Sequence, residues 1–458
     1  MSRAKQSRRD FLKTSAALSL GTLPVWYTST SANAFSFKAA NDRPVIGYIG
    51  TGDRWQSLGP HALDFGEGAA VCDVDKNHVE TAHKIVHDKQ SPKGVDREIA
   101  KYEDYRELLD RKDIDMVVVA TPDHWHSKVA IEAMLAGKDV YCEKPLTLTI
   151  EEGKQIIATL EKTGRVFQVG TQQRSEMEQR FLKAVWLARS GRLGKITKVQ
   201  CAIGGAPTSD EIPVAEVPKE LNFEMWLGQT PKVEYRSGKM GNNSRYPESR
   251  THYEFRWWYE YSGGKMTDWG AHHVDIAQWA IGMEEAGPIS VEGTSVHPVP
   301  FENGYPTQDN RYNTATEFNI VCKFPNEVEM TIRHDTDNGI LIEGTEGKIF
   351  VSRGSLKGKP VEDLEQTPIP EGALVELYKG KEPGDHMRNL FESIHDRTQP
   401  ISDVYTHHRA ITTCHLANIA IRLGKKLEWD PATQMITNDP DANTWQAREQ
   451  RKGYEIEV

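Results

Sequence analysis

From Pro44 onward, short apolar runs alternate with helical stretches, and this order constrains the fold more than any other feature of the sequence. Apolar runs bounded by polar residues, typical of buried parallel strands, occupy 45–49, 69–73, 115–120 and 139–142. Helical patterns lie between them at 78–88, 105–110 and 128–136, and a closing strand is expected over 165–170. The pattern predicts an α/β domain of the Rossmann type over residues 44–170.

The pattern changes in the remainder of the chain, residues 171–458. β-rich stretches without regular intervening helices occur at 196–200, 316–324, 327–333 and 341–343, and a long helix is expected over 407–423. The sequence therefore predicts a second, α+β domain with a large open sheet that is mostly antiparallel. We expect this C-terminal domain to bind the substrate and to mediate oligomerisation.

Residues 1–34 have the composition of a targeting segment. Arg8 and Arg9 stand in the run Ser7-Arg8-Arg9-Asp10-Phe11-Leu12-Lys13, before a mild apolar stretch and the small-residue site Ala32-Asn33-Ala34. The segment resembles a twin-arginine export signal, which implies export of the folded protein to the periplasm. Its apolar stretch is too short and too polar to span a bilayer, so no stable membrane insertion is expected.

The net charge argues against a nucleic-acid partner, and the cysteine spacing argues against a zinc or disulfide framework. The formal net charge is −10, the wrong sign for a protein that neutralises nucleic-acid phosphates. The five cysteines are widely spaced and contain no CxxC pair, so neither a zinc ribbon nor a disulfide framework is expected.

A glycine turn follows the first strand directly. Gly50, Thr51 and Gly52 stand where backbone N–H groups can approach a pyrophosphate at a helix N-terminus, with Asp53 and Arg54 next in sequence. Asp73 ends the second strand, where a carboxylate can accept hydrogen bonds from ribose hydroxyls. This spacing predicts a dinucleotide site.

The glycine motif departs from the full GxGxxG pattern. Trp55 stands at the third glycine position and Gly59 is the next glycine, so a looser packing of helix against strand is expected. Asp73 favours NAD because a carboxylate repels a 2′-phosphate, and Arg54 would favour NADP. We expect NAD, with NADP as the alternative.

Three motifs follow at the ends of later elements. They are Ala120-Thr121-Pro122-Asp123-His124-Trp125-His126, Glu143-Lys144-Pro145-Leu146 and the run from Gly263 to Asp275 that contains Asp268, His272 and His273. Together they resemble the glucose-fructose oxidoreductase, inositol dehydrogenase and MocA family, two-domain NAD(P)-dependent enzymes that act mostly on sugars and polyols. The resemblance covers essentially the whole chain after residue 34, and it implies a homodimer or tetramer.

The chemistry of hydride transfer assigns roles to these residues. Oxidising a secondary alcohol requires a base for the hydroxyl proton and a positive group for the developing alkoxide. The resemblance implies that His272 is the base and Lys144 the charge, with Asp268 four residues before His272 to orient it. We therefore predict Lys144, Asp268 and His272 as catalytic residues.

The same motifs supply further candidates. Near the cofactor we expect Thr121, Pro122, His126, Glu143 and also Lys144. Near the substrate we expect Arg174, Asp275 and Trp257, and His273 has a structural role. A metal held by His272, His273 and Asp275 is the weaker alternative, since adjacent helical histidines diverge by about 100°. No metal is expected.

The leading hypothesis is an NAD(P)-dependent oxidoreductase that acts on a secondary alcohol of a sugar, glycoside or cyclitol. An alternative keeps the cofactor permanently bound and recycles it, either between two sugars or in a redox-neutral glycosidase. A hypothesis of another class is a non-catalytic sugar-binding protein. The substrate is a small carbohydrate in every case.

Overall fold

The computed structural model describes residues 43–241 and 244–458. The export segment predicted over residues 1–34 lies outside them.

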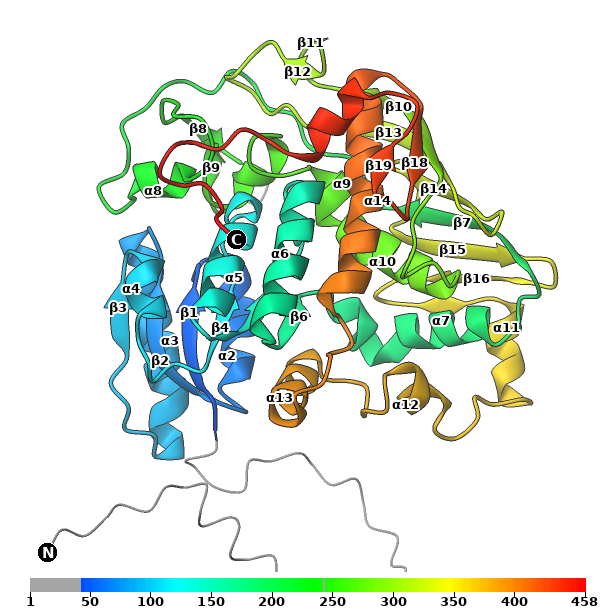
Figure 1. Ribbon diagram of the computed structural model, residues 1–458, viewed down its shortest axis with the longest axis horizontal. Helices are drawn as coiled ribbons and strands as arrows, with labels where there is room; N and C mark the ends of the chain where they lie inside the picture. The colour runs from blue at the N-terminus through cyan, green and yellow to red at the C-terminus, as the bar shows by residue number, and fades with distance from the viewer. Residues whose placement is uncertain (1–42, 242–243) are drawn as a thin grey trace, which may run out of the picture. The chain divides into compact units, whose positions relative to one another are not determined.

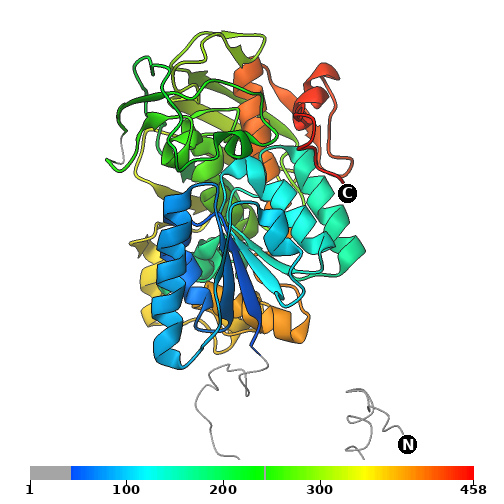
Figure 2. The ribbon, with the colours of Figure 1, turned by 90° about the vertical axis from the view of Figure 1, so that its left-hand side faces the viewer.

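Six parallel strands form the first sheet, in the order β3-β2-β1-β4-β5-β6. The strands are β1 Val45–Ile49, β2 Glu67–Cys72, β3 Ala100–Tyr102, β4 Met116–Val119, β5 Asp139–Cys142 and β6 Phe167–Val169. The helices are α2 Asp53–Ala62, α3 Lys76–Gln90, α4 Tyr105–Leu109, α5 Asp123–Leu135 and α6 Ile150–Thr163. Figure 2 shows the blue strands between α3 on one side and the cyan helices α5 and α6 on the other. This is the doubly wound Rossmann arrangement that the sequence predicted.

Nine strands form the second sheet, in the order β17-β16-β15-β7-β14-β13-β10-β18-β19. They are β7 Ile196–Ala202, β10 Ser290–Val296, β13 Glu317–Lys323, β14 Glu329–Arg333, β15 Gly339–Gly344, β16 Lys348–Val351, β17 Leu356–Lys357, β18 Leu427–Asp430 and β19 Met435–Ile436. Every pair is antiparallel except the parallel pair β7–β14. The mostly antiparallel second sheet is therefore confirmed.

Helices interrupt the second domain more often than the sequence pattern predicted. They are α7 Arg180–Arg189, α8 Phe223–Leu227, α9 Lys265–Asp268, α10 Gly270–Ala280, α11 Lys359–Glu362, α12 Ala373–Leu377, α13 His386–Asp396 and α14 Val404–Leu423. Two short hairpins accompany them, β8 Ser237–Met240 with β9 Pro247–Ser249, and β11 Phe301–Glu302 with β12 Tyr305–Pro306. The expectation that no regular helices lie between the strands was wrong, and α10 escaped it because this helix is buried on all sides and shows no amphipathic period.

The long helix α14 joins the two halves. It packs against α6 of the first domain and against α10 and β10 of the second, as Figure 1 shows. Fifteen of its residues are buried, including His407, His408 and Cys414. The helix therefore belongs to the packing of both domains.

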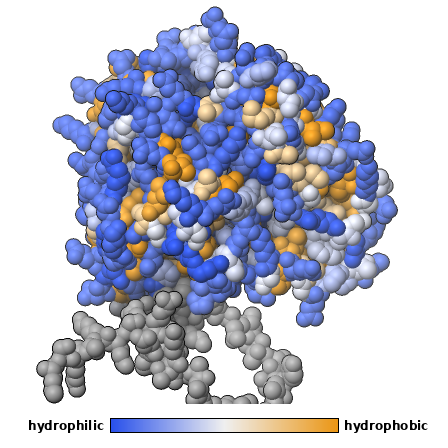
Figure 3. All heavy atoms as spheres, in the orientation of Figure 1, coloured by the Kyte–Doolittle hydropathy of each residue, from blue (hydrophilic) through white to orange (hydrophobic). Residues whose placement is uncertain are grey.

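Polar residues dominate the visible surface, and the cysteines lie in the core. The face in Figure 3 is mostly hydrophilic, with apolar side chains in small scattered groups. All five cysteines are free and buried. No helix in the described ranges is long and apolar enough to cross a membrane.

Trp55 fills the space that a third glycine would leave between α2 and β1. Its indole is fully buried and packs edge-on against Tyr48, with ring centroids 5.1 Å apart. Gly59, one turn later, makes room for it, since a Cβ at position 59 would lie 2.1 Å from Trp55 Nε1. The space is thus filled by a tryptophan and a displaced glycine, and a looser packing of α2 against β1 stays a prediction.

Gly50 leaves no room for a side chain in the turn after β1. Its φ is +77°, and a Cβ there would lie 2.5 Å from the Thr121 nitrogen in the turn after β4. Gly137 offers a matched comparison, since its φ is +83° and a Cβ there would meet no atom of the described residues within 4 Å.

We predict that Gly50→Ala lowers the free energy of unfolding more than Gly137→Ala does. Both variants carry the cost of a left-handed backbone, about 1–2 kcal/mol, but only Gly50→Ala forces β1 and β4 apart. Denaturant titration of both variants measures the difference. Equal losses would show that the two turns are not in tight contact.

Candidate functional site

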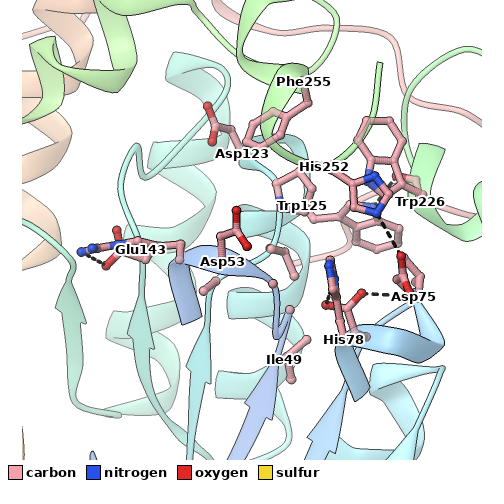
Figure 4. Close-up of a pocket in the computed structure, with 18 of the residues that line it drawn as sticks. Ile49, Asp53, Asp75, His78, Asp123, Trp125, Glu143, Trp226, His252 and Phe255 are labelled. Atoms are coloured by element: carbon pink, nitrogen blue, oxygen red, sulfur yellow. Dashed lines mark hydrogen bonds and ion pairs between the residues drawn. The ribbon is translucent and has the colours of Figure 1, made fainter. Parts of the chain in front are cut away.

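The candidate site is a pocket at the carboxyl ends of β1, β2, β4 and β5, where ligands bind in open α/β sheets. It opens to solvent. Figure 4 shows its lining, which comes from the turns of the first domain below and from segments of the second domain above. Of the predicted residues, those lining it are Gly50, Gly52, Asp53, Arg54, Asp73, Thr121, Pro122, His126, Glu143 and Lys144.

The glycine turn carries the features of a nucleotide site. Thr51 N–H donates to Asp73 Oδ2 at 2.6 Å, which fixes the Asp73 carboxylate beside the turn. The hydroxyl oxygens of Thr51 and Thr121 are buried and have no hydrogen-bond partner in the described part of the chain. These polar atoms and the N-terminus of α2 fit the phosphates and the ribose of a dinucleotide.

Arg54 and Glu143, which both line the pocket, form an ion pair. The Arg54 Nη2 to Glu143 Oε1 distance is 2.9 Å, and Gln172 donates to the same oxygen at 2.7 Å. Burial acts to raise the pKa of Glu143, but the charge of Arg54 outweighs it and the pKa lies below its usual range. The pair therefore remains ionised and orders the turn.

The side chain of Lys144, next to Glu143 in sequence, contacts the second domain. Its Nζ lies 2.5 Å from Asp268 Oδ1 and donates to the Asp268 carbonyl at 3.0 Å. The Lys144–Pro145 bond is cis. Burial acts to raise the pKa of Asp268, yet Lys144 and Arg256 together bring it below its usual range. The structure thus brings together two of the three predicted catalytic residues.

His272 is placed differently from the sequence expectation. Asp268 ends α9 and His272 belongs to α10, so the two residues are not on one continuous helix, and Asp268 is engaged by Lys144. The imidazole is buried, and its Nδ1 has no hydrogen-bond partner among the residues described. Burial and the charge of Lys144 hold the pKa of His272 well below its usual range, so the ring is neutral.

Three predicted substrate residues lie outside the pocket lining. Arg174 and Asp275 form a closed pair through two bonds of 2.7 Å, with side chains at most 3% exposed. Trp257 is buried and its indole N–H donates to Glu254. His273, for which a structural role is expected, is fully buried, and its Nε2 lies 3.0 Å from Asn338 Oδ1.

His126 braces the two turns that carry the motifs. Its ring nitrogens lie 2.9 Å from the Thr121 carbonyl and 2.8 Å from the Pro145 carbonyl. It therefore connects the turn after β4 to the turn after β5, beside the pocket.

A roof from the second domain covers the end of the pocket near Asp73, and sequence reasoning missed it. Tyr246 donates to Asp53 Oδ1 at 3.0 Å and stacks on His252, with ring centroids 4.8 Å apart. His252 Nε2 in turn lies 2.9 Å from Asp75 Oδ2. No motif marks these residues, because the hydrogen bonds join positions about 180 residues apart in the sequence.

Asp75, His78 and His252 are also the residues of the described chain whose arrangement could hold a metal, with ligand atoms within 4.8 Å of one another. His252 is bound to Asp75, and His78 Nδ1 lies 3.4 Å from Asp73 Oδ2. These contacts account for the cluster as a set of hydrogen bonds between the roof and the first domain.

Asp123 is a further lining residue for which the sequence assigned no role. It begins α5, accepts a hydrogen bond of 2.5 Å from the Ser262 hydroxyl, and has its pKa raised by burial. It lies among the cations of this end of the pocket, since His126, Arg256 and Lys144 act electrostatically on it.

Comparison with protein families decides the relationship. One family model, described as the oxidoreductase family NAD-binding Rossmann fold, matches residues 45–171, and a second, the C-terminal alpha/beta domain of the oxidoreductase family, matches residues 207–456. The chain belongs to the Gfo/Idh/MocA oxidoreductase family. Its first domain is an NAD-binding Rossmann domain, which confirms the predicted cofactor class.

Named relatives match a shorter segment. A glycosyl hydrolase family 109 protein of Shewanella pealeana is 34% identical over 173 residues, 35% of this chain and 38% of the relative. An α-N-acetylgalactosaminidase of Shewanella oneidensis is 36% identical over 180 residues, 34% of this chain and 37% of the relative. The match thus spans little more than a third of the length of these relatives.

The fold as a whole is shared with solved structures. The WlbA dehydrogenase from Bordetella pertussis, in complex with NADH and UDP-GlcNAcA, aligns over 84% of this chain and 98% of its own. The TM-score is 0.58 at 18% identity, a similarity of fold.

The His78–Asp73 contact predicts a pH dependence of stability. Burial alone lowers the pKa of His78, but the hydrogen bond and charge of Asp73 outweigh it and raise the pKa to about 9, from 6.5. The folded state therefore binds this proton more tightly than the unfolded chain. Its stabilising contribution is full below about pH 6.5 and is lost as the pH rises through about 9.

We expect His78→Gln to remove about 1–3 kcal/mol of this pH-dependent stability. Denaturant titrations between pH 6 and pH 10 measure the slope for the wild type and the variant. His87→Gln, at an exposed position on the same helix, serves as the control. Identical slopes for the wild type and His78→Gln would refute the assignment.

Proposed function

We propose that this protein is an NAD-dependent oxidoreductase that oxidises or reduces a secondary alcohol of a sugar, glycoside or cyclitol. The observation that carries the proposal is the Lys144–Asp268 pair, which places a charged lysine at the meeting of the nucleotide pocket and the second domain. The family and its NAD-binding domain supply the context.

The residues of the pocket fit the cofactor, and different residues would hold its different parts. The turn at Gly50–Gly52 would hold the pyrophosphate, and Asp73 the adenosine ribose. Thr121, Pro122 and His126 line the other end. When bound, the nicotinamide supplies the acceptor or donor of a hydride at the carbinol carbon.

The chain's own residues would manage the proton and the charge. Lys144 would stabilise the alkoxide that develops as the hydroxyl loses its proton. The neutral imidazole of His272 would accept that proton on oxidation and return it on reduction. Asp268 would act as a positioning residue, since it fixes the Lys144 ammonium at 2.5 Å.

A second candidate function follows from the roof over the pocket. Tyr246 and His252 cover the adenosine end through contacts with Asp53 and Asp75, which favours a cofactor that stays bound between turnovers. Transient oxidation of a sugar carbon would then labilise a glycosidic bond, water would replace the leaving group, and the returned electrons would leave hydrolysis as the net reaction. The names of the Shewanella relatives agree with this glycosidase alternative. Reduction of a second sugar is the other way to recycle the cofactor.

Export through the twin-arginine route and work in the periplasm complete the proposal. The paired arginines Arg8 and Arg9 support it, and folding before export explains how a cytoplasmic nucleotide could be carried along. We also propose a homo-oligomer, a dimer or a tetramer, formed through the open face of the nine-stranded sheet. Partly buried apolar side chains on that sheet, such as Val321, Leu341 and Phe350, support this interface.

Lys144→Met tests the catalytic assignment. We expect kcat to fall by about 10²-fold or more, because the alkoxide loses its charge partner, while the amount of bound nucleotide stays the same. Reduction of the bound nicotinamide on a panel of sugars and glycosides is the measurement, with the exposed Lys162→Met as control. Full turnover by Lys144→Met would overturn the assignment, and no turnover by the wild type on any member would favour a sugar-binding protein.

Cofactor retention has its own test. We expect the purified protein to release NAD only on denaturation, as identified by mass spectrometry. His252→Ala removes the bond to Asp75 and the stacking of Tyr246, so it should lose NAD during gel filtration. His87→Ala should retain it. A wild type that carries no nucleotide would contradict the recycling alternatives and leave a freely exchanging dehydrogenase.

A further inference from the structure

Three cationic side chains, those of Arg256, Lys265 and Arg353, lie near the Lys144–Asp268 pair. None of them has, among the described residues, a carboxylate partner that it does not share. Arg256 Nε lies 3.8 Å from Asp268 Oδ1, the oxygen that Lys144 already contacts at 2.5 Å. Lys265 and Arg353 form no ion pair with any residue in 43–241 or 244–458. All four cations act electrostatically on Asp268.

Aromatic rings hold these three cations in place. Arg256 lies over Tyr253 and Phe255 at 4.5 and 4.7 Å, Lys265 over Trp257 at 5.5 Å, and Arg353 over Trp269 at 4.5 Å from the ring centroids. A cation on an aromatic face keeps its charge while its flexible side chain is ordered. The arrangement is therefore a built cluster, and Trp257 contributes to it by supporting Lys265.

The cations oppose one another in the absence of an anion. Burial lowers the pKa of Lys265, and Lys144 and Arg256 lower it further against the pull of Asp268. The pKa of Arg353 is lowered by burial and by the charge of Arg54. A bound anion would reduce this repulsion between the cations, and that reduction would strengthen its binding.

The nearby acids do not balance the cluster. Asp123 is the second carboxyl near Lys144 and Arg256, and its pKa is raised by burial. Glu254 also acts on Arg256, but its Oε2 accepts hydrogen bonds from Trp257 and Tyr312. Glu143 and Glu176 act on Arg353, but both also act on Arg54, and Glu143 is paired with it. None of these carboxylates in the described residues forms an ion pair with Lys265 or Arg353.

The cofactor does not supply the missing charge either. Its phosphates belong at the glycine turn, where the N-terminus of α2 and Arg54 would meet them. The oxidised nicotinamide ring is itself positive, so it adds to the excess beside Lys144. The anion must then come from the other ligand of the site.

We propose that the substrate is an anionic carbohydrate, with a carboxylate or a sulfate group bound by Arg256, Lys265 and Arg353 while its reacting hydroxyl meets Lys144. This inference rests on the proposed oxidoreductase function and adds the substrate class to it. Arg256 lines the pocket and presents a guanidinium suited to two-point contact with either group.

Matched pairs of substrates test the charge. The holoenzyme is given 4-nitrophenyl glucoside against 4-nitrophenyl glucuronide, the corresponding galactoside against galacturonide, and each free neutral sugar against its 6-sulfate. Reduction of the bound nicotinamide and release of nitrophenol are both recorded. We expect kcat/KM to favour the acidic member of at least one pair by about tenfold or more, and the KM of that member to rise with salt.

The outcomes separate the two proposals. Turnover of neutral members as fast as or faster than acidic ones overturns the anionic substrate and leaves the oxidoreductase intact. No turnover of any member by either readout counts against the oxidoreductase itself. A preference for uronides identifies a carboxylate, and a preference for sulfated sugars identifies a sulfate.

Variants of Lys265 locate the anion site. Lys265→Gln should reduce the preference for the acidic member by about tenfold, mainly through KM, and Lys265→Arg should restore most of it. Lys357→Gln, which removes an exposed lysine, should leave the preference unchanged. An unchanged preference in folded Lys265→Gln and in Arg353→Gln would overturn the assignment of the cluster.

Discussion

The ion pair between Lys144 and Asp268 is the contact on which the site depends. It joins the turn after β5 in the first domain to the end of α9 in the second, with Lys144 Nζ 2.5 Å from Asp268 Oδ1. Both side chains are largely buried, and Lys144 and Arg256 together hold the pKa of Asp268 below its usual range. The pair therefore fixes where the two domains meet and holds one ammonium group at the inner end of the nucleotide pocket.

The two ends of the pocket have different physical characters. At one end, Tyr246 and His252 reach from the second domain to Asp53, which follows β1, and to Asp75, which follows β2. At the other end, Lys144 and Arg256 line the pocket, and Lys265 and Arg353 lie over aromatic rings near the Lys144–Asp268 pair. One end of the pocket is thus covered by the second domain over acidic residues, and the other is lined by cations.

Most of the fold could be predicted from the sequence because buried parallel strands are continuous apolar runs. β3 was missed because it has only three residues at the edge of the sheet and no apolar run. The helix α6 was missed, although Thr149 caps it and Gly164 ends it. The helices of the second domain escaped because α10, buried on all sides, lacks the polar face that gives a helix its period.

The sequence by itself determined the nucleotide turn, its acidic partner Asp73 and the lysine after β5, because these features depend on short-range order along the chain. Only the tertiary structure decided what each group meets: Asp268 holds Lys144 rather than His272, and Arg174 is closed against Asp275. It also decided that Trp55 could replace a glycine. The reason is physical: pairing partners, burial and charge balance arise from residues a hundred or more positions apart, and no local pattern encodes their distance.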